Sequence, residues 1–228
     1  MRSTFFKKTS LIICVKDEAF TIGSVIRAGK AEVNEVLIVD GHSTDRTRQI
    51  ARKEGAQVVL DAGLGKGEAI RRGIKKARGE ILVFMDGDGS HEAKDIPELI
   101  RPIQEEQADL VLASRGKGGS DELHGNFEKM MRLIGSSVIT LIINLRFNQT
   151  LTDSQNGFRA IKKNTAEELS LRENNFSIEQ EMIMKALKKN CRIVEIPSHE
   201  YARQAGKSHI NLLSMSWDYL WCLLKNIL

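Results

Sequence analysis

Cysteine and proline are scarce in this 228-residue sequence, which contains three of each. Cys14, Cys191 and Cys222 are widely spaced and form no CxxC pair, which argues against a disulfide framework or a structural zinc site. A reduced, cytoplasmic setting suits this cysteine usage. The sequence also lacks a linker rich in proline, glycine or serine, so we expect a single domain over residues 1–228.

Long apolar runs and a strong charge imbalance are absent too. No run reaches about 18 uninterrupted apolar residues, and the short run Leu11–Val15 is followed directly by charged residues. We therefore expect neither a transmembrane helix nor a signal peptide. The 34 basic and 30 acidic residues give a net charge of +4. This excess suits phosphate-bearing partners but is too weak to indicate nucleic acid.

Short apolar runs alternate with segments of helical periodicity in the first half of the chain. The expected strands are Leu11–Val15, Val36–Val39, Gln57–Leu60, Ile81–Met85 and Leu110–Ala113, and the expected helices are Thr21–Gly29, Ser43–Glu54, Glu68–Ala77 and Ile96–Glu106. This alternation predicts an α/β, Rossmann-like fold with a mostly parallel central sheet flanked by helices. Ligands of such sheets bind beyond the carboxyl ends of the strands.

The second half of the chain is less regular and contains two very apolar helical segments. Its expected helices are Phe127–Leu145, Glu179–Lys188 and Ile210–Leu228, and its expected strands are Phe158–Ile161 and Arg192–Ile196. The last helix is amphipathic, with Trp217 and Trp221 on its wide apolar face. Two interpretations remain open for these apolar helices: they pack as core or in a homodimer, or they lie in a membrane interface.

The segment Asp86-Gly87-Asp88 directly follows the predicted strand Ile81–Met85. Two carboxylates one residue apart at a strand end can both face a divalent ion, and oxygen ligands suit Mg²⁺ or Mn²⁺ bound to substrate phosphates. The alternative is an Asp/Gly turn with solvated charges. An EF-hand loop is excluded, because His91 stands where glycine is required and Pro97 where the bidentate glutamate belongs.

Two further segments fit a nucleotide site. Asp40 ends the strand Val36–Val39 and could bind a ribose or the edge of a base. Gly65-Lys66-Gly67 precedes a helix, so its backbone amides and the Lys66 ammonium could meet a phosphate. The segment is not a P-loop, which requires a different spacing of its glycines and lysine.

The order of the motifs is more specific than any one of them. Along residues 11–208 the chain reads KDE, VDGHSTDRT, GKG, DGDG, TDSQNGFRAI, IEQE and YARQAGKS. In this order it resembles the family 2 glycosyltransferases, and within them the dolichyl-phosphate mannose and glucose synthases. The resemblance implies a GT-A-type fold with a nucleotide-binding half over 1–115, an acceptor half over 116–209 and a C-terminal amphipathic helix over 210–228.

The resemblance also implies an inverting transfer and its partners. A hexose would pass from a GDP-mannose or UDP-glucose type of donor, with Mg²⁺ or Mn²⁺, to a polyprenyl or dolichyl phosphate. The implied nucleotide-sugar ligands are Glu18, Asp40, Lys66, Asp86 and Asp88, and the implied metal ligands are Asp86 and Asp88 with His91 close behind. Cys14, Gly41 and His42 depart from the family pattern, which leaves the base open.

The remaining motifs supply the expected catalytic and acceptor residues. Asp153 matches an aspartate near the acceptor and would act as a base or an orienting group, unless it caps a turn. Arg203 and Lys207 match a basic segment that closes over the diphosphate. The candidates for the acceptor phosphate are Arg115, Arg132, Arg159 and Ser208, because guanidinium groups bind phosphate bidentately. Arg132 could instead snorkel from its apolar helix.

Several alternatives stand beside this interpretation. Glu179 is expected on a solvated face of its helix, outside the site.

The acceptor could be a soluble sugar, a phosphoglycerate or a polysaccharide end, and the protein could bind nucleotide sugars without catalysis. A sugar-phosphate nucleotidyltransferase is disfavoured, because the first turn, Cys14–Ala19, contains no glycine. We expect a cytoplasmic protein, with or without peripheral contact to the cytoplasmic membrane face.

Overall fold

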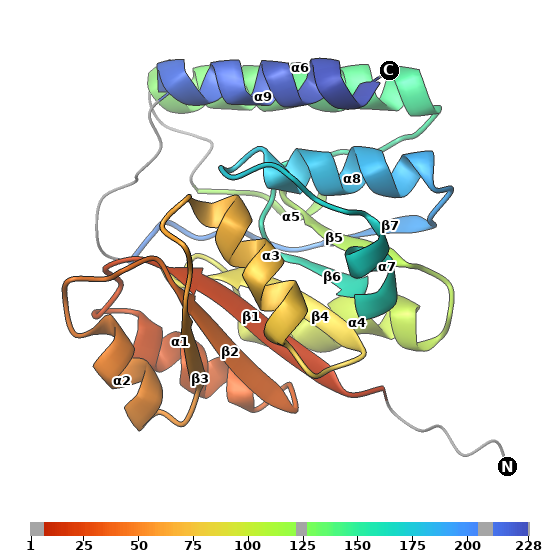
Figure 1. The fold of residues 1–228 in the computed structure, drawn as a ribbon. Coiled ribbons are helices and arrows are strands. Elements are labelled where there is room, and N and C mark those ends of the chain that lie inside the picture. Colours follow the sequence, from red (N-terminus) through yellow and green to blue (C-terminus); the bar gives the residue numbers. More distant parts are fainter. Residues whose placement is uncertain (1–6, 122–126, 205–211, 228) are drawn as a thin grey trace, which may run out of the picture.

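The computed structural model describes residues 7–121, 127–204 and 212–227 (Figure 1). Within these residues, seven strands form one sheet in the order β3-β2-β1-β4-β6-β5-β7. They are β1 (Thr9–Val15), β2 (Glu35–Asp40), β3 (Gln57–Leu60), β4 (Ile81–Asp86), β5 (Leu110–Ser114), β6 (Arg159–Lys162) and β7 (Ile193–Pro197). All neighbouring strands pair in parallel except β6, which runs antiparallel to β4 and β5. The expected mostly parallel α/β sheet is confirmed.

Helices cover both faces of this sheet. They are α1 (Ile22–Lys30), α2 (Thr47–Lys53), α3 (Lys66–Lys76), α4 (Ile96–Gln104), α5 (Arg115–Gly118), α6 (Phe127–Phe147), α7 (Lys163–Glu168), α8 (Ile178–Lys188) and α9 (Leu212–Ile227), with a 3₁₀ turn at Ala93–Asp95. Buried side chains of α1, α2 and α4 form one core cluster with the sheet, and those of α3, α7 and α8 form another.

Side-chain alternation along β1 shows how one strand serves both clusters. Leu11 and Ile13 point toward α1 and α4, whereas Ile12 points toward α3 and α8, and all three are buried. Full burial of each such side chain contributes about 1.5–3 kcal/mol. A near-continuous apolar strand is therefore stable only at the centre of a sheet covered on both faces, which is where β1 lies.

Helices α6 and α9 form an outer layer beyond α8, on the side away from the sheet (Figure 1). Few of their side chains are buried, among them Ile143, Cys222 and Leu223. Many large apolar side chains are exposed on the outside of this layer instead, namely Met130, Ile134, Leu141, Leu145, Trp217, Trp221 and Leu224. These seven residues form what we call the outer apolar face. Met131, Val138 and Leu220 are also exposed, but they line the pocket described below.

Two polar side chains of α9 contact the rest of the protein. The carboxylate of Asp218 accepts a hydrogen bond of 2.8 Å from Asn175, and Lys225 lies 3.4 Å from the Glu173 carboxylate. Trp217, the residue before Asp218, is nevertheless 68% exposed. The interpretation of this face as core is therefore wrong for its described residues.

The described residues include one helical segment long and apolar enough to cross a membrane by length and composition. It spans Lys129–Phe147, with a mean hydropathy of 1.4 and only 11% of its residues buried. We expected no such helix because no apolar run is uninterrupted. Arg132 and Asn144 interrupt this segment, but they lower its mean hydropathy only a little.

Candidate functional site

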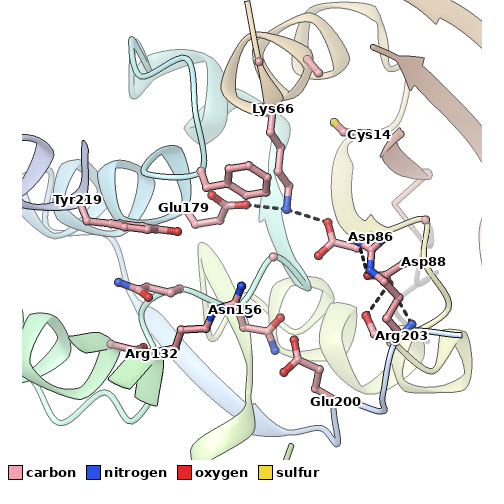
Figure 2. Close-up of a pocket in the computed structure, with 18 of the residues that line it drawn as sticks. Cys14, Lys66, Asp86, Asp88, Arg132, Asn156, Glu179, Glu200, Arg203 and Tyr219 are labelled. Carbon is pink, nitrogen blue, oxygen red and sulfur yellow. Dashed lines mark hydrogen bonds and ion pairs between the residues drawn. The ribbon is translucent and has the colours of Figure 1, made fainter. Parts of the chain in front are cut away.

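A pocket of about 1280 Å³ lies where the carboxyl ends of β1 and β4 approach the layer formed by α6 and α9 (Figure 2). Many of its charged side chains come from strand ends, from the start of α3 and α8 and from the segment after β7, and α6 adds Lys129 and Arg132. The largest group of apolar side chains comes from α6 and α9. The pocket therefore has a charged half and an apolar half, and the strand-end motifs lie in the charged half, as expected from the sheet topology.

Lys66 links two carboxylates at the centre of the pocket. Its Nζ lies 2.7 Å from Oδ1 of Asp86 and 3.0 Å from Oε1 of Glu179 (Figure 2). Burial alone would lower the pKa of Lys66, but the two neighbouring carboxylates outweigh it and raise that pKa above its ordinary value. Burial likewise opposes ionisation of Asp86, yet Lys66 and His91 hold the Asp86 pKa below its usual range. Lys66 and Asp86 are therefore both charged at neutral pH.

Glycines allow this cluster to form. A Cβ at Gly67 would lie 2.2 Å from the carbonyl oxygen of Glu173, and the Gly67 amide instead donates to the carbonyl of Asn174 at 2.6 Å. A Cβ at Gly157 would lie 3.0 Å from Oδ2 of Asp86. The GKG segment thus brings the start of α3 against the loop before α8, and its Gly67 amide is already engaged rather than available to a phosphate.

Arg203 connects two more of the expected residues. Its guanidinium lies 2.8 Å from Oε1 of Glu18 and 3.1 Å from Oδ2 of Asp88 (Figure 2). Burial raises the pKa of Glu18 although Arg203 opposes the shift. The segment after β7 therefore reaches back across the mouth of the pocket. Lys207 and Ser208, expected in the same basic segment, lie outside the described residues.

Asp40 lies beside the pocket at the end of β2 and is fully buried. Its Oδ1 accepts a hydrogen bond of 2.9 Å from the Ser43 amide, while its buried Oδ2 has no hydrogen-bond partner. The flanking residues Val39 and Gly41 line the pocket. An unsatisfied buried acceptor is costly, but Asp40 does not itself line the pocket, so a ligand would reach this oxygen only if the flanking residues moved.

Asp153 does not have the surroundings of a general base. It is 4% exposed and pairs bidentately with Arg115, at 2.6 Å to Nε and 3.0 Å to Nη2. It also accepts hydrogen bonds from the backbone amides of Arg115, Gln155 and Asn156. Asp153 therefore fixes the turn that leads into β6 and holds Arg115 in place. These contacts do not fit the expected role as a base, whereas they fit the alternatives of an orienting group and of a turn cap.

The same interaction changes the role expected of Arg115. Arg115 lines the pocket, but its guanidinium is already bound to Asp153 and lies 3.5 Å from Oε2 of Glu200. With two carboxylates as partners, Arg115 has little positive charge left to offer an acceptor phosphate.

Arg159 also differs from its expected role. The expected phosphate ligand is 1% exposed, and its guanidinium donates to the backbone carbonyls of Asn156 and Glu179. It does not line the pocket, because β6 directs its side chain into the interior. Arg159 therefore ties the start of α8 to the loop before β6. Arg132, in contrast, does line the pocket (Figure 2).

Asp86 and Asp88 fit a divalent cation as oxygen ligands. Each carboxylate borders the pocket and interacts with a cationic side chain, Lys66 or Arg203, so each position already stabilises positive charge. His91 lies behind Asp86, with Nε2 3.6 Å from Oδ2, and stacks on Phe158. Among the described residues, no three His, Cys, Asp or Glu side chains converge as a metal site. The expected three-ligand set with His91 is therefore not formed, and an ion here would need further ligands from a substrate.

Glu179 is the site residue that sequence reasoning missed. It was expected on a solvated helix face, yet it is 3% exposed, lines the pocket and has a buried Oε2 without a hydrogen-bond partner. Nothing in the segment IEQE distinguishes Glu179 from Glu181, whose carboxylate holds backbone amides outside the pocket. Only the approach of Lys66 from α3 marks Glu179 as part of the site.

Comparisons with known proteins show which sequences and folds this chain resembles. Among curated proteins, glycosyltransferase AglJ of Haloferax volcanii is 30% identical over 192 residues, covering 83% of this chain and 62% of the relative. The low-salt glycan biosynthesis hexosyltransferase Agl6 of the same organism is 27% identical over 192 residues, covering 84% of this chain and 46% of the relative. This chain therefore spans less than two thirds of either relative.

Solved structures show the same fold. Glucosyl-3-phosphoglycerate synthase from Mycobacterium tuberculosis, in complex with Mn²⁺, UDP and glucosyl-3-phosphoglycerate, superposes with a TM-score of 0.77 at 22% identity, covering 97% of this chain and 80% of that protein. The expected GT-A-type architecture is confirmed by this match. The family described as glycosyl transferase family 2 matches residues 10–170. Since this match covers well over half of the chain, the protein belongs to glycosyl transferase family 2.

Proposed function

We propose that this protein transfers a hexose from a nucleoside-diphosphate sugar to a polyprenyl or dolichyl phosphate, with Mg²⁺ or Mn²⁺ as cofactor. The observation that carries the proposal is the division of one pocket into two halves. Asp86 and Asp88 lie in its charged half with Lys66 and Arg203, and the apolar side chains of α6 and α9 form its other half. A charged donor and an amphiphilic acceptor can therefore meet in this pocket.

The charged half suits the donor. A divalent ion held by Asp86 and Asp88 would neutralise charge on the departing diphosphate. Lys66 and Arg203 border the same space, and fixed cations stabilise a developing negative charge most effectively in a buried site. Arg203 would exchange its contacts with Glu18 and Asp88 for the diphosphate. The unpaired Oε2 of Glu179 can accept a hydrogen bond from a sugar hydroxyl. The M. tuberculosis synthase, whose complexes contain Mn²⁺ or Mg²⁺ with UDP, supports this assignment.

The acceptor phosphate would face the other side of the pocket. Arg132 of α6 borders the polar half, and the α6 residues that follow it along the pocket are small or apolar. A phosphate monoester is already ionised near pH 7 and attacks without help from a strong base. This agrees with the placement of Asp153 outside the lining of the pocket, because such an acceptor does not depend on that carboxylate as a base. Single displacement at the anomeric carbon inverts its configuration.

Contact with the cytoplasmic face of a membrane is part of the proposal. The outer apolar face includes Trp217 and Trp221, and aromatic and aliphatic side chains of this kind favour a lipid interface. Lys129 and Arg146 near the two ends of α6 could approach anionic headgroups. A polyprenyl phosphate would then reach the pocket from the membrane without leaving its apolar surroundings.

The test is transfer of labelled hexose from a panel of UDP- and GDP-sugars, with Mg²⁺ or Mn²⁺, to polyprenyl phosphate in mixed micelles or to 3-phosphoglycerate in solution. We expect metal-dependent label in the lipid fraction. Asp88→Asn should abolish it, whereas Asp109→Asn, at the opposite end of the sheet, should not. Label in phosphoglycerate alone would refute the lipid acceptor but keep the transferase. No turnover of any donor by the unaltered protein would refute the proposed function.

A further inference from the structure

The apolar half of the pocket is built from one side of α6 and the facing side of α9. Met131, Val138, Ile139 and Ile142 of α6 line it together with Leu220 and Leu223 of α9. Gly135 lies in the middle of this wall and lines the pocket as well. Arg132 precedes Gly135 by three residues, which places both on the same side of the helix.

Gly135 has no explanation within the described part of the protein. It lies in the interior of a 21-residue helix, where glycine is less stable than alanine. A Cβ added at Gly135 would meet no atom within 4 Å. Other pocket glycines behave differently, since a Cβ at Gly157 would press against Asp86 at 3.0 Å and one at Gly65 would lie 2.6 Å from a carbonyl oxygen. At those positions the chain requires glycine, and at Gly135 it does not.

We infer that Gly135 keeps open a passage for the hydrocarbon chain of the acceptor, and that this passage selects acceptors by their chain. The inference rests on the proposed function. The acceptor phosphate lies near Arg132, and its chain runs along the apolar wall past Gly135. A side chain at position 135 would project into the space that the acceptor occupies, so the absence of a side chain is useful only when the acceptor is bound.

The charge and polarity of the wall favour an alkyl or isoprenoid chain over a small polar acceptor. A phosphoglycerate or a free sugar would leave the six apolar side chains around Gly135 in contact with water. A hydrocarbon chain would cover them, and burial of apolar surface is favourable in proportion to its area. The passage therefore suits a phosphate monoester that carries a long apolar chain.

The test is a size series at this position, Gly135→Ala, Gly135→Leu and Gly135→Trp, with Ser137→Trp as the matched control. Ser137 lies on the same helix, is exposed and does not line the pocket. Transfer is measured to a long-chain polyprenyl phosphate and to a short-chain, water-soluble alkyl phosphate. Affinity for the nucleoside diphosphate with Mn²⁺ is measured by calorimetry, and Tm is measured for each variant.

We expect Gly135→Ala to raise Tm by about 1–4 °C, because alanine favours the helix and nothing obstructs it. Gly135→Leu and Gly135→Trp should lower kcat/KM for the long-chain acceptor about ten-fold or more, a change equivalent to about 1.4 kcal/mol. Short-chain transfer and nucleotide affinity should stay within about two-fold. Ser137→Trp should leave all four measurements unchanged.

Each of three results would overturn the inference. Undiminished long-chain transfer by folded Gly135→Trp and Gly135→Leu would show that no chain passes this position. An equal loss of long- and short-chain transfer would show that the site is blocked or distorted as a whole. If the unaltered protein turns over no donor, the proposed function itself fails. If it transfers hexose equally well to both acceptors, the transferase stands and only the selective passage is refuted.

Discussion

Replacement of Asp153 by asparagine distinguishes a catalytic base from a structural carboxylate. Asp153 accepts hydrogen bonds from Arg115, Gln155 and Asn156 and is almost fully buried. Burial alone would raise its pKa, but the charge and hydrogen bonds of Arg115 lower that pKa below its ordinary value. The neutral asparagine keeps the shape of the side chain and removes the charge that Arg115 pairs with.

The expected loss of stability follows from the burial of the Asp153–Arg115 ion pair. Removing one partner of a buried ion pair costs about 3–5 kcal/mol, a large part of a total stability of about 5–15 kcal/mol. For a chain of this length, Tm should fall by roughly 6–20 °C. Since the folded-state pKa of Asp153 is lowered, its stabilisation is fully present above the unfolded value, near 3.9, and is lost as the pH falls through the folded value. The difference between the two proteins should therefore shrink below about pH 4.

Urea unfolding at several pH values and steady-state transfer kinetics are the assays. Asp109→Asn is the control, because Asp109 also pairs with an arginine, Arg192, but is more exposed and lies away from the pocket. That variant should lose less stability than Asp153→Asn, about 1–3 kcal/mol, because Asp109 also accepts hydrogen bonds from Lys162 and from the Arg192 amide but stays in contact with solvent. If Asp153 were the catalytic base, Asp153→Asn would lower kcat by about 10²–10⁴-fold at unchanged stability. It would also remove the acidic limb of the pH dependence of kcat. That result would refute the structural assignment.

Two other substitutions test neighbouring parts of the site. Gly157→Ala should place a Cβ 3.0 Å from Oδ2 of Asp86 and 3.1 Å from Nζ of Lys66, so calorimetry should show about a ten-fold loss of nucleoside-diphosphate affinity. Unchanged affinity would place the donor elsewhere in the pocket. Arg159→Met should leave the carbonyls of Asn156 and Glu179 without their donor and cost about 2–5 kcal/mol in urea unfolding. A selective rise in acceptor KM at unchanged stability would instead restore Arg159 as a phosphate ligand.

Local sequence patterns predicted the first five strands because each is a short apolar run that a helical segment follows. They could not predict that β6 runs antiparallel. A four-residue strand such as Arg159–Lys162 contains no information on its direction, which depends on pairing with β4 and β5 far away in the chain. The strand-end motifs were placed correctly at one edge of the sheet, because parallel strands bring their carboxyl ends together.

Burial explains the site residues that sequence reasoning misplaced. Glu179, Asp153 and Arg159 are all charged, and charged residues are usually assumed to face water unless a partner is known. Their partners are the Lys66 ammonium, the Arg115 guanidinium and backbone carbonyls, respectively. Lys66 and Arg115 come from other elements of the fold. The sequence alone therefore does not show that Glu179 and Asp153 are buried beside them.

The reversed strand β6 also has a consequence for how the chain folds. β6 fills the position between β4 and β5 but is synthesised after both and after α6. Until the chain has passed Lys162, the edge of β4 that β6 later covers remains unpaired, and unpaired edges recruit other strands. Such non-local pairing slows folding and prolongs exposure of apolar strands. A nascent or truncated chain that ends before β6 should therefore be prone to aggregation and depend on chaperones.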